Sequence, residues 1–208
     1  FCHCLPNKWH LMSVMLSASN CLDWVCFITG NSIDKALINA ESFAENINSI
    51  SNAPYFLPYM SGERTPHNDP HVRGSFHQLK TTTNQAALQY AVLEGISFGI
   101  LDGVNSIGSV NEDFNDIFMV GGGSQSSFWV NLLSTITSRK LSVCDQSEYG
   151  AAIGVARLAM FVDNNIIEKD TIIKKINIKK TFQPNLDKIN ILKDRYLDWK
   201  NIYFTSKK

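Results

Sequence analysis

The sequence predicts an α/β fold, and the order of elements in residues 116–161 carries that prediction. An apolar run at 116–120 (DIFMV), typical of a buried strand, leads directly into three glycines at 121–123. A helical pattern follows, then a strand at Leu141–Cys144 and a helix rich in small residues at Gly150–Phe161. A strand, a glycine turn, a helix, a strand and a helix in this order are typical of an α/β domain.

Composition limits the class of protein. The chain has 208 residues, of which 44% are hydrophobic and 18% charged, so it can bury a core as one large or two small domains. Nineteen basic residues balance nineteen acidic ones. This balance gives the chain no electrostatic reason to bind nucleic acid or an anionic membrane as its main partner. No apolar run reaches about 18 residues, so we expect no membrane span.

The cysteines indicate a reducing compartment. Five cysteines cannot all pair within the chain, so we expect reduced thiols and a cytoplasmic location. Cys21 and Cys26 fall on a predicted helix and are expected to be core thiols. The Cys-His-Cys run at residues 2–4, with His10, could bind a metal, but a strand with alternating side chains explains it better. Three further histidines lack the spacing of zinc ligands: His67, His71 and His77.

The first fifty residues contain helical patterns after a short strand. Phe1–Leu5 predicts a strand closed by Pro6, and Lys8–Ile28 predicts a helix for which Gly30 supplies the stop. Residues 31–50 give a weaker, polar helical pattern. The apolar positions of the first helix gather on one face and its flank: Leu11, Val14, Met15, Ala18, Cys21, Leu22 and Val25.

A long loop and a long helix follow. Tyr55–Gly74 is expected to be a loop because prolines and glycines interrupt it repeatedly. Asn84 is predicted to cap a helix that runs to about Ile107. In this helix Gly95 and Gly99 leave a smooth face for close packing.

The end of the chain differs in composition. After Val162 the sequence is rich in Asn, Ile and Lys, and residues 163–180 predict a surface helix plus a linker. The Lys174–Lys180 run is either a solvated face or an anion site. A final amphipathic helix carries three aromatic residues on one side: Tyr196, Trp199 and Tyr203.

The best local signal for chemistry is the glycine turn at 121–123. Glycines let a backbone approach a ligand closely, and Ser126 or Ser127 can cap the helix that follows. The free N–H groups of that helix start attract an anion, of which a diphosphate is the natural example. The pattern is neither a Walker motif nor a dinucleotide fingerprint, so a tight strand-to-helix turn explains it equally well.

A second candidate is the loop Gly62–Pro70 (GERTPHNDP). Its polar side chains could coordinate phosphate, a metal or sugar hydroxyls. Equally, an ion pair between Arg64 and a carboxylate could simply hold the loop in place. The residues concerned are Glu63, Arg64, His67 and Asp69.

Four stretches together resemble the FGGY carbohydrate kinases in order and spacing, over essentially the whole chain. They are 54–74 (PYFLPYMSGERTPHNDPHVRG), 91–95 (AVLEG), 121–129 and 148–159 (EYGAAIGVARLA). The GERTPHNDP loop and residues 1–24 resemble the bacterial xylulokinases in particular, and the tail resembles the closing helix of the family. One departure is Gln78, where the family pattern usually has glycine.

The resemblance implies an actin-like, ribonuclease H-like ATPase fold, with this chain matching the C-terminal domain of a two-domain sugar kinase. It implies ATP and Mg²⁺ as cofactors and D-xylulose as the sugar, held mostly against an N-terminal domain. Gly150 and its helix would back the adenine pocket. The residues implied to contact the nucleotide are Gly121, Gly122, Gly123 and Ser127, with Ser19 and Asp23 on the first helix.

The same resemblance sets the expected domain boundaries. Residues 1–162 would be the nucleotide-binding domain, incomplete at its N-terminus, and 163–208 its linker and closing helix.

The general base of the family is an aspartate expected before Phe1, so no catalytic residue and no activity are expected of this chain alone. A kinase of another pentulose or polyol stays open, as does a non-catalytic nucleotide-binding module. An exposed strand edge at Phe1–Leu5 would also leave a homodimer open.

Overall fold

The computed structural model describes residues 1–5, 7–108, 117–163 and 177–205, except for the side chains of 161–163. The chain divides into two compact units, one comprising residues 1–113 with 186–208 and the other residues 114–185. The domain boundary expected after residue 162 stays a prediction. Within the described residues, no helix has both the length and the apolar character needed to cross a membrane.

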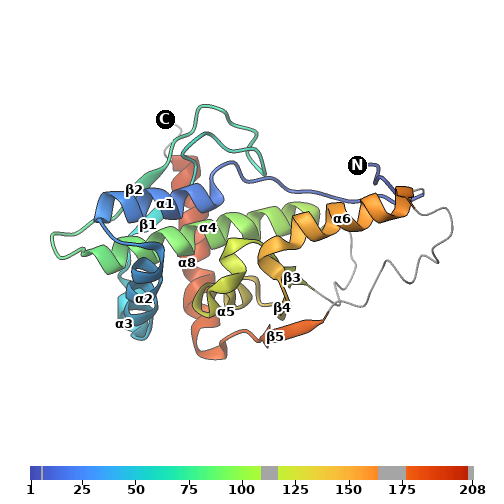
Figure 1. Ribbon diagram of the computed structural model, residues 1–208. Helices are drawn as coiled ribbons and strands as arrows, with labels where there is room; N and C mark the ends of the chain where they lie inside the picture. The colour runs from blue at the N-terminus through green and yellow to red at the C-terminus, as the bar shows by residue number, and fades with distance from the viewer. Residues whose placement is uncertain (6, 109–116, 164–176, 206–208) are drawn as a thin grey trace. The chain divides into compact units, whose positions relative to one another are not determined.

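The first unit is a group of helices around α4, with a two-stranded hairpin (Figure 1). Helices α1 and α2 pack along α4, and α8 contacts α4, α3 and β1. The elements are α1 (Ala18–Thr29), α2 (Ile33–Ala44), α3 (Ile47–Ser51), β1 (Tyr55–Leu57), β2 (Ser75–His77), α4 (Gln85–Ile107) and α8 (Leu186–Thr205).

The long central helix has the cap and the smooth face that the sequence predicts. Asn84 accepts a hydrogen bond from the Ala87 N–H at 3.0 Å, which begins α4. A Cβ at Gly95 would overlap the carbonyl oxygen of Phe56, and one at Gly99 would press on the side chain of Met15. Gly95 is therefore needed for β1 to approach α4 closely, and Gly99 leaves room for the Met15 side chain.

The closing helix α8 is held by a buried polar core as well as by its aromatic face. Tyr196, Trp199 and Tyr203 are buried, as the sequence predicts. The Arg195 guanidinium forms an ion pair of 2.6 Å with Glu94 of α4, and both side chains are almost fully buried. Arg195 thereby ties the last helix to the centre of the unit.

The predicted helix at Lys8–Ile28 is wrong over its first ten residues, because α1 begins only at Ala18. Residues before it hydrogen-bond to a distant loop instead: the Val14 N–H donates to Thr65 Oγ1 at 3.0 Å and the Leu16 N–H to Glu63 Oε1 at 3.2 Å. These tertiary bonds satisfy amides that a helix would otherwise use.

Two expectations about short strands also need correction. Phe1–Leu5 forms no regular strand and contributes only an isolated antiparallel bridge between Cys2 and Trp9. The expected loop at Tyr55–Gly74 begins with strand β1, which pairs antiparallel with β2. Alternation over three residues is too short for the sequence to distinguish a strand from a loop.

The second unit contains a three-stranded sheet in the order β3-β4-β5. Strand β3 runs parallel to β4, and β5 runs antiparallel to β4. The expected strands at 116–120 and Leu141–Cys144 are confirmed where they are described. The elements are β3 (Phe118–Met119), η1 (Gly122–Gln125), α5 (Ser127–Thr137), β4 (Leu141–Cys144), η2 (Ser147–Tyr149), α6 (Gly150–Asp163) and β5 (Ile178–Phe182).

Strand β5 corrects the expectation of a helix and linker over 163–180. Residues 164–176 lie outside the described residues, but Ile178–Phe182 is an edge strand, with four exposed residues before the buried Phe182. Lys179 and Lys180 are exposed, which agrees with a solvated face. Lysines on an edge strand discourage pairing with another chain.

Candidate nucleotide-binding site

The glycine turn after β3 has an open surface over its backbone. Gly121 has a φ of 86°, in the left-handed region that favours glycine. A Cβ at Gly121 or Gly122 would meet no atom of the described residues within 4 Å, the adjacent residues of the chain apart. Gly122 has no positive φ and no close neighbour in this unit, so neither backbone nor packing explains its glycine. The main chain at Gly122 is open to the approach of a ligand.

Two amides of the turn have no acceptor among the described residues. Gly122 and Gly123 are the first residues of η1, so their N–H groups have no acceptor within that helix. Ser126 is the residue that caps α5, since its Oγ accepts from the Trp129 N–H at 3.2 Å. Ser127 is exposed, and Lys180 Nζ donates to its Oγ at 3.3 Å. A helix start with a nearby ammonium group favours an anion.

Two serines hold the turn in shape. The Gly121 N–H donates to the Ser147 carbonyl at 2.9 Å, and the Ser124 hydroxyl donates to the Gly121 carbonyl at 2.7 Å. Ser124 and Ser147 hydroxyls lie 2.7 Å apart, so Ser147 is the donor of that pair. Because both side chains are buried, the backbone groups of the turn are fixed before any ligand arrives.

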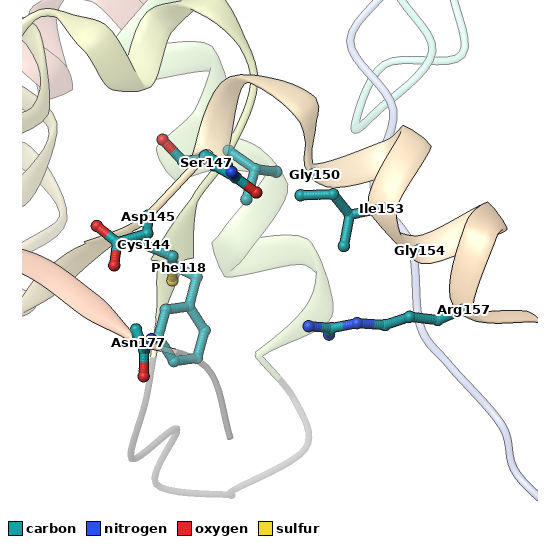
Figure 2. A pocket seen from close by; sticks show the side chains of 11 residues that line it. Phe118, Cys144, Asp145, Ser147, Gly150, Ile153, Gly154, Arg157 and Asn177 are labelled. Carbon is teal, nitrogen blue, oxygen red and sulfur yellow. The ribbon is translucent and has the colours of Figure 1, made fainter. Parts of the chain in front are cut away.

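A pocket of about 340 Å³ adjoins the turn, beside the ends of β3 and β4 and the start of α6 (Figure 2). Val120, the residue before the glycines, lines it together with Ser147 and Gly150. A Cβ at Gly150 would lie 3.1 Å from that of Val120, so the glycine allows α6 to begin close to the turn. Figure 2 shows the Arg157 side chain extending from α6 toward the pocket.

The ionisable groups of this pocket favour binding over covalent chemistry. Burial raises the pKa of the Cys144 thiol, and the neighbouring Asp145 carboxylate raises it further. A thiol with a raised pKa stays protonated near neutral pH and is a poor nucleophile. Arg157 supplies a positive charge and Asp145 a negative one at the lining of this pocket. No described carboxylate pairs with Arg157, so its guanidinium is available to an anionic part of a ligand.

Sequence reasoning missed three residues that shape this site. Ser124 and Ser147 fix the glycine turn, and Arg157 provides the cation at the pocket. Arg157 had a visible signal, since it is the one basic residue in the otherwise apolar stretch 150–162. The two serines had none, because their role depends on contact between η1 and η2.

The remaining predicted contacts lie in the other unit. Ser19 and Asp23 are exposed on α1, four residues apart and so on the same face of the helix. Their predicted contact with the nucleotide stays a prediction. Gly121, Gly122, Gly123 and Ser127 are brought together at one end of the second unit's sheet.

The GERTPHNDP loop is built mainly by its own acidic residues. Glu63 accepts from the N–H groups of Arg64, at 2.7 Å, and Leu16. Asp69 accepts from two backbone amides and from the Tyr203 hydroxyl at 3.2 Å. The alternative of an Arg64 ion pair is wrong, because Arg64 forms none in the described residues. Backbone amides hold the loop instead.

The comparison with known families settles the kind of protein. Residues 2–162 match the C-terminal domain of the FGGY family of carbohydrate kinases. The chain belongs to this family. The family resemblance of the sequence is thereby confirmed over most of its length.

The relatives share both sequence and a name. The xylulose kinase of Escherichia coli K12 is 34% identical over 203 residues, which is 98% of this chain and 41% of that protein. The xylulose kinase of Klebsiella pneumoniae is 36% identical over 89% of this chain and 38% of its own length. The chain therefore spans about two fifths of the length of the relatives it matches.

Solved structures confirm the expected fold. A crystal structure described as a xyloylose kinase of Brucella ovis matches with a TM-score of 0.85 and 32% identity, over 99% of this chain and 41% of that one. Glycerol kinase of Plasmodium falciparum with ADP matches at a TM-score of 0.72 and 19% identity, over 93% of this chain and 38% of that one, which speaks for the fold alone. The chain has the actin-like fold of the C-terminal domain of the FGGY sugar kinases.

Proposed function

We propose that this chain is the nucleotide-binding part of an ATP-dependent D-xylulose kinase. The observation that carries the proposal is the glycine turn at 121–123, whose open backbone and unpaired amides suit a phosphate chain. The adjoining pocket would take the adenosine, with Gly150 at its wall. Membership of a family of carbohydrate kinases supports the same assignment.

The residues of this chain would bind and orient the phosphoryl donor. When bound, MgATP supplies the phosphoryl group and the metal's charge stabilisation. The bond between the γ-phosphorus and the bridging oxygen to ADP breaks, and a bond to the terminal hydroxyl of the sugar forms. The proton of that hydroxyl goes to a base that we expect outside residues 1–208. Fixed amides at 122 and 123, with Ser127, would hold the phosphates in line for this step.

The substrate is proposed from the relatives. Three curated proteins that match this chain across most of its length are named xylulose kinases. Because the sugar is expected to bind mostly outside this chain, few of the residues that select it are here. The assignment to D-xylulose therefore depends on similarity, while the assignment to a nucleotide depends on geometry as well.

A coupled ADP-release assay tests the activity. The product of the complete open reading frame is assayed with D-xylulose, D-ribulose, L-ribulose and glycerol. The proposal predicts a strong preference for D-xylulose, and no turnover by residues 1–208 alone. Turnover of another substrate would keep the kinase and reject the sugar. Absence of turnover with every substrate would favour a non-catalytic nucleotide-binding module.

A further inference from the structure

A second pocket, of about 320 Å³, lies in the first unit, between the GERTPHNDP loop and the helices α4 and α8. Its polar lining residues are His67, Asp102 and Lys200, and its other walls are Pro66, Tyr203 and Phe204. Its volume is at the lower end of the range for small-molecule sites.

Asp102 has unused hydrogen-bonding capacity at this pocket. The side chain is 3% exposed, and its Oδ1 accepts from the Tyr196 hydroxyl and lies 3.5 Å from Lys200 Nζ. Its Oδ2 is buried and has no hydrogen-bond partner among the residues that the structure describes. A buried carboxylate oxygen without a donor costs free energy, and a hydroxyl group of a ligand would supply that donor.

The other groups make the pocket both rigid and mixed in character. The His67 imidazole stacks on Tyr203 with ring centroids 3.6 Å apart, and its Nε2 lies 2.9 Å from the Tyr59 hydroxyl. Lys200 is half-exposed, so its ammonium can donate to a ligand while it stays near Asp102. Phe204 adds an apolar ring at 62% exposure.

The charges decide which class of ligand fits. An anion would be attracted by Lys200 but repelled by the carboxylate of Asp102, which is only 3.5 Å from that ammonium. A cation would be attracted by the carboxylate of Asp102 but repelled by the ammonium of Lys200. A neutral hydroxyl both donates and accepts, so adjacent hydroxyls can satisfy Asp102 and Lys200 at once.

We propose that this pocket binds a small neutral polyol or sugar, with Asp102 and Lys200 as its hydrogen-bonding partners and Phe204 against its carbon atoms. No residue lines both this pocket and the one beside the glycine turn. This binding does not depend on the proposed kinase activity.

The test is an NMR titration of the 208-residue chain with xylitol, glycerol and inorganic phosphate. Saturable xylitol binding is expected, with a dissociation constant on the order of millimolar and shifts at His67, Lys200 and Phe204. Lys200→Met should weaken binding at least about tenfold. Lys193→Met, an exposed lysine on the same helix, is the matched control and should leave it unchanged.

Other outcomes would overturn the proposal. These are the absence of saturation by xylitol and glycerol, equal binding by Lys200→Met, or tighter binding of phosphate than of either polyol. Asp102→Asn gives a second check. It should also weaken xylitol binding in a variant whose NMR spectrum shows that it is folded. ADP titrated into the same sample reports on residues 121–127, so failure of the polyol site and failure of the proposed function are distinguishable.

Discussion

Gly121 and Gln78 both have a positive φ, but only Gly121 is a glycine. Gly121 has a φ of 86°, and Gln78 has one of 60° although it carries a side chain. The resemblance to the family implies a glycine at the position of Gln78, and the left-handed φ gives a physical reason for one. The departure noted in the sequence is therefore a position of local strain in this chain.

We predict that Gln78→Gly stabilises the chain by about 0.5–1 kcal/mol, because it relieves a left-handed φ at an exposed position. Urea denaturation of the two proteins measures the difference. Gln78→Ala is the control, since it removes the side chain but keeps the strained φ, and it should bring no gain. A stabilisation by alanine as large as that by glycine would show that the side chain, not the backbone, is responsible.

A substitution at Gly122 tests the proposed nucleotide site. Gly122→Ala should weaken ADP binding about tenfold, because a methyl group would occupy the open space over the turn. Its effect on stability should be small, since the added Cβ has open space around it in the described part of the chain. Isothermal titration calorimetry gives the affinity. Ser138→Ala, at the opposite end of α5, is the control and should bind ADP as the parent does.

At the scale of elements, a buried ion pair joins α4 and α8. Arg195 bonds both carboxylate oxygens of Glu94 and also donates to the carbonyls of Ala53 and Pro54 just before β1. Its guanidinium lies over the Tyr55 ring at 4.3 Å. One side chain thus connects a helix near the C-terminus to two elements far earlier in the chain.

Breaking this pair should be costly. Arg195→Met leaves Glu94 buried without its partner, and we expect a loss of about 3–5 kcal/mol in the free energy of unfolding. The double variant Glu94→Gln with Arg195→Met should lose less than the sum of the two single changes, because neither charge is then left alone. Urea denaturation measures all three variants. A loss below about 1 kcal/mol for Arg195→Met would contradict this role.

The hairpin of β1 and β2 gives a pH-dependent prediction. Burial lowers the pKa of His77 below its usual 6.5, and its Nε2 lies 2.7 Å from Ser75 Oγ. As pH falls below about 6.5, the unfolded chain therefore takes up a proton more readily than the fold, and stability is lost. His77→Gln should lose less stability than the parent between pH 7 and 5, as thermal melts at several pH values would show. Parallel pH profiles of the two proteins would contradict the assignment.

Elements with a strong local signal were predictable from the sequence. The cap at Asn84, the strand at Leu141–Cys144 and the aromatic face of α8 all depend on residues close together in the chain. The structure of residues 8–17 was not predictable, because hydrogen bonds to Thr65 and Glu63 override the helical spacing of this segment. Strand β5 was missed because the run at 178–182 is short and contains two exposed lysines.

The candidate site was predictable only in part. The glycines and a capping serine are visible as a motif, but the serine pair that fixes the turn joins residues 23 positions apart. Long-range contacts of this kind have no local pattern. The polar pocket beside Asp102 was missed for the same reason, since its residues come from three separate segments.

At the scale of the whole molecule, the chain spans about two fifths of its relatives and forms two compact units. The second unit holds the glycine turn and its adjoining pocket. The first holds the long central helix, the GERTPHNDP loop and the polar pocket. The proposed function assigns the nucleotide to the glycine turn, and the further inference assigns a neutral polyol to the first unit.

The central claim is that the glycine turn binds a nucleotide, and an ADP titration of the 208-residue chain followed by NMR tests it most directly. We predict saturable binding with a dissociation constant on the order of millimolar or tighter, with the largest shifts at Gly121–Ser127 and at Arg157. Weaker binding by Gly122→Ala would support the same assignment. Absence of saturation at such concentrations, or shifts that avoid this turn, would contradict the account.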